Sequence, residues 1–102
     1  MKFNIPPTNL DLPINYDESP WPIIKQAREQ YVIEQDRRCW HCNNLLESLP
    51  VEEVLNSEID WSFFPPKFQK WPIHLHHCHK TGMSIGAVHM NCNAYLWQYL
   101  GE

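Results

Sequence analysis

Residues 74–82 read HLHHCHKTG and residues 84–93 read SIGAVHMNCN, and these two stretches decide the fold. Apolar and polar side chains alternate over residues 73–76, which is consistent with a strand over 73–77. Lys80-Thr81-Gly82 is a turn signal, and residues 84–88 have the composition of a returning strand. From His89 to Leu100 the pattern is that of a helix. We therefore expect the order strand, turn, strand, helix.

The chain upstream of this hairpin is expected to supply one long helix and several irregular segments. Residues 19–38 are expected to be this helix, with Ser19 as the candidate N-cap and proline in the first turn. The helical pattern itself runs from Ile23 to about Arg38. Residues 1–18 are expected to be an extended arm laid across the domain, and residues 50–59 a short helix. Residues 60–71 carry five aromatic side chains, which predicts an ordered insertion. Its rings are expected to pack beneath the metal site, and stacking on nucleic-acid bases is the alternative.

A chain of 102 residues is long enough for one small domain, in which a bound metal would add much to stability. We expect residues 1–102 to form a single α+β unit with a hairpin-plus-helix core and an N-terminal helix. Its parts are the arm at 1–18, the helix at 19–38, a knuckle at 39–42, an insertion at 43–71 and the core at 72–100.

The cysteines predict a structural zinc site. Cys39 and Cys42 form a C-x-x-C pair, and His89 and Cys92 form an H-x-x-C pair. A two-residue gap lets both side chains of a pair reach one ion, and four N/S ligands satisfy tetrahedral zinc. Cys78 is the alternative fourth ligand, and unconnected buried thiols are the alternative to a metal site. His41, inside the knuckle, is expected to point outward.

Composition limits the classes of protein that the chain can belong to. The formal net charge is −4 and the pI about 5.8, which counts against nucleic-acid binding, although bound divalent metals add local positive charge. No stretch is apolar enough to span a membrane, and the N-terminus lacks the apolar region of a signal peptide. We therefore expect a cytoplasmic protein in a reducing compartment, where cysteines bind metals more often than they form disulfides.

Four histidines at positions 74, 76, 77 and 79 suit metal binding and proton transfer better than core packing. Strand alternation predicts His74 and His76 on one face and the other two on the opposite face. Phosphodiester hydrolysis needs a base for water and a metal for the phosphate charge and the leaving oxygen. His77 is the candidate base, and His76 and Asn93 are the candidate metal ligands.

The two stretches quoted above, together with the knuckle at 39–42, resemble the HNH, or ββα-metal, nucleases. The likeness is greatest to the phage recombination endonuclease VII branch, in which an H-L-D-H-D-H segment leads through a glycine turn to a C-x-x-C-N helix start. The likeness covers residues 72–97 and the knuckle, and leaves the arm and the insertion outside. It implies a ββα-metal fold and a phage or prophage origin in a bacterial or phage-infected cell.

The resemblance also implies a role for each matching residue. His77 matches the general base, and His79 matches a supporting histidine near the scissile phosphate. His76 and Asn93 match the ligands of the catalytic Mg2+ or Mn2+. The four structural zinc ligands are matched by Cys39, Cys42, His89 and Cys92.

Three positions depart from the family pattern. His76 stands where that branch has aspartate, which favours borderline metals such as manganese, cobalt or nickel over magnesium. Cys78 also replaces a frequent aspartate, and no role is assigned to it. His89 replaces a cysteine, which zinc tolerates.

The resulting prediction is a metal-dependent DNA endonuclease that nicks with low sequence specificity. Candidate phosphate contacts are Lys67, Lys70 and Lys80, each of which could equally be a solvated surface lysine. A non-catalytic zinc module that binds DNA or protein is the alternative, followed by a structural zinc domain of a larger assembly. Oligomeric state and the preferred DNA structure are left open.

Overall fold

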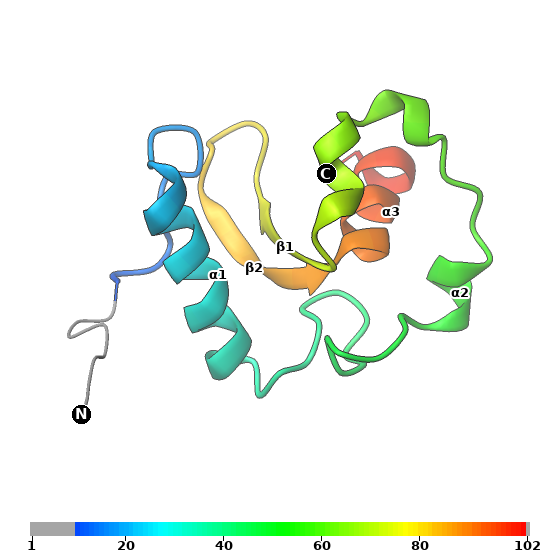
Figure 1. Ribbon diagram of the computed structural model, residues 1–102, viewed down its shortest axis with the longest axis horizontal. Helices are drawn as coiled ribbons and strands as arrows, with labels where there is room; N and C mark the ends of the chain where they lie inside the picture. The colour runs from blue at the N-terminus through cyan, green and yellow to red at the C-terminus, as the bar shows by residue number, and fades with distance from the viewer. Residues whose placement is uncertain (1–9, 102) are drawn as a thin grey trace.

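The computed structural model describes residues 10–101 and shows a two-stranded antiparallel hairpin between two helices (Figure 1). The hairpin consists of β1 (Ile73–His77) and β2 (Ser84–His89). Helix α1 (Trp21–Glu34) packs against both strands on one side, and α3 (Met90–Leu100) contacts both strands on the other. The predicted order of strand, turn, strand and helix is confirmed, in a small mixed α/β fold.

The hairpin register contains one irregularity. Ile73 pairs with His89 and His76 pairs with Gly86, but His77 pairs with Ser84. Ile85 therefore has no counterpart in β1, which makes a bulge in β2. A bulge increases the local twist of the pair, and this one lies beside the histidines of β1.

The first helix is shorter than the predicted range 19–38. It begins after Pro20, which is the N-cap, while the Ser19 hydroxyl donates to the backbone oxygen of Asn15 instead of capping the helix. The helix ends at Glu34 because Asp36 and Arg37 both take positive φ values, of 58° and 64°, which an α-helix does not allow.

The part of the N-terminal arm that the structure describes lies along the start of β2. Ile14 accepts a hydrogen bond from the Ser84 amide, and its own amide donates to the Ser84 hydroxyl. The Tyr16 amide donates to the Gly82 carbonyl at 2.6 Å. The described part of the arm therefore contacts β2, but residues 16–18 form a turn and are not extended as predicted. Residues 1–9 lie outside the described range.

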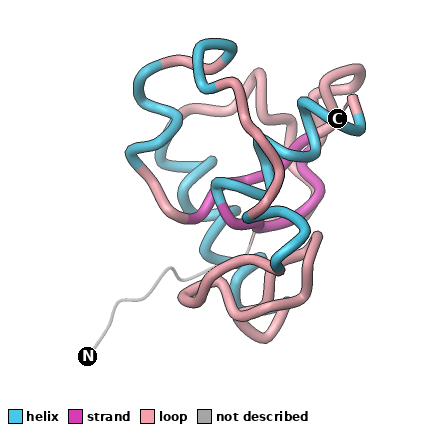
Figure 2. The backbone as a smooth tube through the Cα atoms, turned by 90° about the vertical axis from the view of Figure 1, so that its right-hand side faces the viewer, coloured by secondary structure: helices cyan, strands magenta, loops and turns pink. Residues whose placement is uncertain are grey.

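The segment between α1 and β1 is mostly loop and contains three short helices (Figure 2). These are α2 (Glu52–Leu55) and the 3-10 turns η1 (Trp61–Phe63) and η2 (Pro66–Lys70). The predicted short helix within 50–59 is confirmed. Aromatic rings of η1 and η2 contact Trp97 of α3 and His74 of β1, so they lie beside the histidines. The expectation that they pack beneath the cysteines was wrong.

The hydrophobic core and the cysteine pairs occupy the same place. Val88 of β2, Leu96 of α3 and Val54 of α2 are buried in one cluster, and the same cluster contains Cys39 and Cys92. With a core this small, the side chains that would bind a metal supply part of the packing between the elements.

The turn of the hairpin requires glycine at position 82, because the backbone there is left-handed and a Cβ atom would have no room. Gly82 has a φ of +79°, and a Cβ atom there would lie 2.7 Å from the Asp17 carboxylate and 3.0 Å from the Asn15 side-chain oxygen. We expect Gly82→Ala to lower the free energy of unfolding by about 1–3 kcal/mol, measured by urea unfolding of the metal-loaded protein. Gly101→Ala is the matched control, because Gly101 has a φ of +74° but no atom within 4 Å of the added carbon. Equal losses in both variants would contradict the role of the Asp17 contact.

Candidate functional site

Four side chains from three parts of the chain form a compact Cys3His cluster. The Sγ atoms of Cys39, Cys42 and Cys92 and a ring nitrogen of His89 all lie within 4.8 Å of one another. The Nδ1 atom of His89 is 3.5 Å from the Cys42 sulfur and 3.6 Å from the Cys92 sulfur. A tetrahedral zinc with ordinary Zn–S and Zn–N bonds implies a sulfur-to-nitrogen separation of about 3.6 Å. The cluster therefore has the dimensions of a structural zinc site.

Backbone hydrogen bonds hold the two halves of the cluster together. The knuckle turns back at Asn43, whose φ is 69° and whose amide donates to the Cys39 carbonyl. The Trp40 amide donates to the Ala87 carbonyl at 2.9 Å, which ties the knuckle to β2. His89 ends β2 and is the N-cap of α3, so the second pair of ligands spans the junction between strand and helix.

Hydrogen bonds around the cluster orient the His89 ring and favour the thiolate form of Cys39, and both effects favour cation binding. The Nε2–H of His89 donates to the Leu45 carbonyl at 2.9 Å, which leaves the Nδ1 lone pair directed at the cysteines. The Cys39 sulfur accepts a hydrogen bond from the Cys92 thiol. It also accepts hydrogen bonds from the backbone amides of Cys42, His89 and His41. These hydrogen bonds lower the pKa of Cys39 to about 4, whereas the shared proton and burial raise the pKa of Cys92. A cation would replace that shared proton.

The donor set is consistent with a structural metal such as zinc, and it decides between the two candidate fourth ligands. Cys78 lies outside the cluster, in the hairpin turn, where its sulfur accepts hydrogen bonds from Thr81. The cluster thus contains His89, the preferred fourth candidate, and does not contain Cys78. His41 is not part of the cluster, and its ring lies 5.6 Å from that of Tyr95. All four cysteines are free of disulfides.

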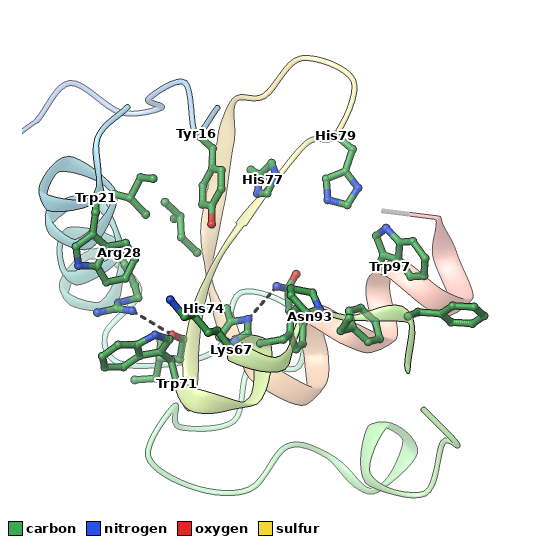
Figure 3. Close-up of a pocket in the computed structure, with 17 residues that line it drawn as sticks. Tyr16, Trp21, Arg28, Lys67, Trp71, His74, His77, His79, Asn93 and Trp97 are labelled. Atoms are coloured by element: carbon green, nitrogen blue, oxygen red, sulfur yellow. Dashed lines mark hydrogen bonds between the residues drawn. The ribbon is translucent and has the colours of Figure 1, made fainter. Parts of the chain in front are cut away.

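A cavity of about 490 Å³ lies between the hairpin, α1 and the 3-10 turns, and it collects three of the histidines (Figure 3). Alternate residues of β1, including Leu75 and His77, line this cavity. His79, which lies in the hairpin turn, also lines it. His74 reaches the same cavity although regular alternation would place it on the other face. Asn93 joins them from the first turn of α3.

His77 is held by aromatic neighbours. The Tyr16 ring stacks on it with a centroid distance of 3.9 Å and an interplanar angle of 6°. The His79 ring meets its edge at 4.9 Å. Burial and the neighbouring His79 lower the pKa of His77, with a smaller contribution from His76, and Asp17 partly offsets this. Near neutral pH the imidazole is therefore mainly unprotonated, which is the form that accepts a proton.

The structure brings Asn93 next to His74 and does not bring it next to His76. The Asn93 amide nitrogen donates to Nδ1 of His74 at 3.1 Å, which leaves the amide oxygen available to the cavity. His76 does not line the cavity, and its buried ring packs 5.5 Å from that of Trp40. The physical reason is the strand period, which places His76 on the face opposite to His77.

The three candidate phosphate lysines are separated in the structure. Lys67 lines the cavity, Lys70 lies over the Trp71 ring at 5.2 Å, and Lys80 is in the hairpin turn and does not line the cavity. Arg28 does line it, with its guanidinium 5.7 Å and 5.8 Å from the ring centroids of Trp21 and Trp71.

Sequence reasoning missed Arg28 and Tyr16 as site residues. Arg28 lies on α1 and Tyr16 lies on the arm, both far along the chain from the histidines. No local spacing links these positions to the hairpin, so the only available signal was the general expectation that the arm crosses the domain.

Comparisons with protein-family models, with curated proteins and with solved structures found no match to this chain. Within the described range 10–101, no helix combines the length and the apolar character that crossing a bilayer requires.

Proposed function

We propose that this chain is a metal-dependent DNA endonuclease of the HNH type that nicks one strand at a time. One observation carries the proposal: His77, with a lowered pKa, shares a cavity with His79 and with the Asn93 amide. Asn93 directly follows Cys92, so the cluster that holds the start of α3 also positions this amide. A base and an oxygen ligand in one cavity suit hydrolysis of a phosphodiester.

The proposed step is an in-line displacement at phosphorus. His77 takes a proton from a water molecule, the water oxygen forms a bond to phosphorus, and the bond from phosphorus to the 3′-oxygen breaks. In this proposal His79, whose ring centroid is 4.9 Å from that of His77, would assist at the phosphate. Tyr16 stacks on His77 and thereby fixes the plane of its ring.

The catalytic cation would be held by the cavity residues that supply free donor atoms. Asn93 offers its amide oxygen, and its amide nitrogen donates to Nδ1 of His74. The neutral His74 ring therefore carries its proton on Nε2, and it would orient Asn93 without binding the ion itself. An amide oxygen is a hard ligand of the kind that magnesium and manganese prefer. When bound, such an ion supplies positive charge for the phosphate and the leaving oxygen. We therefore propose that Asn93 binds the ion, that His74 positions the Asn93 amide, and that His76 is not a ligand.

A non-catalytic zinc module is the second candidate. The net charge of −4 favours it, because most proteins that bind DNA carry a basic surface. In that interpretation the Cys3His cluster is the only metal centre, and the histidines of the cavity have no chemical role.

A supercoiled-plasmid assay separates the two candidates. The zinc-loaded protein is incubated with plasmid and with magnesium, manganese, cobalt or nickel, and nicked and linear products are measured on a gel. We expect nicked circles first, with magnesium or manganese as the effective ion, because the ligand that Asn93 offers is an amide oxygen. Failure to cut any DNA form with any of the four metals would favour the zinc module. Nicking with cobalt or nickel but with neither magnesium nor manganese would contradict the assignment of the Asn93 amide oxygen as the protein ligand.

A further inference from the structure

Aromatic side chains flank the histidines of the cavity on both sides. Figure 3 shows Trp21 and Trp71 on one side of His77 and Asn93, and Trp97 on the other. Four of the aromatic residues that line the cavity are 40–60% exposed to solvent, which is high for large apolar side chains. They are Trp21, Phe63, Trp71 and Trp97. Exposed rings that surround a cavity provide stacking surfaces for planar ligands.

The charge of the cavity is opposite to that of the whole chain. The chain carries a net charge of −4, but Arg28 and Lys67 line the cavity, and no Asp or Glu within the described range does. The Arg28 guanidinium is held in place by the Ile73 carbonyl, at 3.5 Å, and by the faces of Trp21 and Trp71. Two cations among aromatic rings suit a ligand with planar groups joined by phosphates.

We infer that this cavity binds unpaired nucleotides of a DNA strand, with bases stacked on the aromatic rings and the backbone phosphate near Arg28 and Lys67. The inference rests on the proposed nuclease function and specifies its substrate. In a duplex the base faces are covered by their neighbours, so only a single-stranded or displaced base can stack in the cavity. A volume of about 490 Å³ lies within the usual range for small-ligand sites.

Binding without cutting is measured with His77→Ala, loaded with zinc and without any other added metal. The probe is a fluorescein-labelled ten-residue oligothymidine, followed by anisotropy and by quenching of tryptophan fluorescence. A mixed-sequence duplex of the same length is the comparison. We expect the single strand to bind at least 10-fold more tightly than the duplex, because stacking of one base on an aromatic ring contributes roughly 5- to 150-fold in affinity.

Matched variants, made in the His77→Ala background, separate the cavity from the rest of the surface. Phe63→Ala and Trp21→Ala should each weaken single-strand binding on the order of 10-fold. Tyr99→Ala should leave it unchanged, because Tyr99 is similarly exposed, at 48%, but lies outside the cavity. Lys67→Gln should reduce the salt dependence of binding, and Lys25→Gln, on the exposed side of α1, should not.

The outcomes distinguish this inference from the proposed function. Equal binding of single strand and duplex, or equal losses in Phe63→Ala and Tyr99→Ala, would overturn the inference even if the wild-type protein nicks plasmid. Single-strand binding that depends on Phe63 would support the inference even if the wild-type protein cuts no DNA. An unchanged melting temperature in each variant shows that the fold is intact.

Discussion

Removal of the metal is expected to unfold this chain. Cys39 and Cys92 are at most 2% exposed and belong to the hydrophobic core. Without a cation, three sulfurs and an imidazole nitrogen would stay within 4.8 Å of one another in that core. Structural zinc contributes on the order of 10 kcal/mol in zinc-finger peptides, which is comparable to the whole stability of a small domain. The measurement is far-UV circular dichroism during titration with a strong chelator, followed by addition of zinc.

Cysteine variants test the same prediction at single positions. Cys92→Ser should unfold the chain or lower its melting temperature strongly, because a buried ligand is lost. Cys78→Ser is the matched control and should melt like the wild type, because Cys78 lies in the hairpin turn outside the cluster. An unchanged melting temperature in protein shown by elemental analysis to be free of zinc would contradict the structural role of the cluster.

Replacement of His77 by alanine is expected to abolish most nicking while the fold persists. A general base contributes about 10²- to 10⁴-fold to the rate, so single-turnover nicking with manganese should fall by at least the lower figure. The fold should persist because His77 is at the wall of the cavity and is not part of the Cys3His cluster. The rate is measured by gel quantification of plasmid nicking.

Two controls make the His77 result specific. His41→Ala removes a histidine that lies outside both the cavity and the cluster, and it should nick at the wild-type rate. Zinc content and melting temperature of His77→Ala should match those of the wild type. If His77→Ala nicks within a few-fold of the wild-type rate, His77 is not the base and the proposed mechanism is wrong.

Local patterns in the sequence were sufficient to predict the hairpin, the last helix and the Cys3His ligands. Strand alternation and the glycine turn are properties of neighbouring residues, so they can be recognised without a structure. The two-residue gaps in Cys39–Cys42 and His89–Cys92 limit each pair to one ion. Local patterns did not predict where α1 ends. Asp36 and Arg37 have positive φ values, so the helix stops before them although the sequence up to Arg38 has a helical pattern.

The sequence by itself therefore determined the order of the elements and the four members of the Cys3His cluster. Only the tertiary structure decided which histidine meets Asn93, because that contact joins β1 to α3 and depends on how the helix packs on the twisted hairpin. It also decided that Tyr16 stacks on His77 and that Arg28 lines the cavity. These contacts connect residues that are far apart in the chain, and such pairs acquire a fixed geometry only when the core packs.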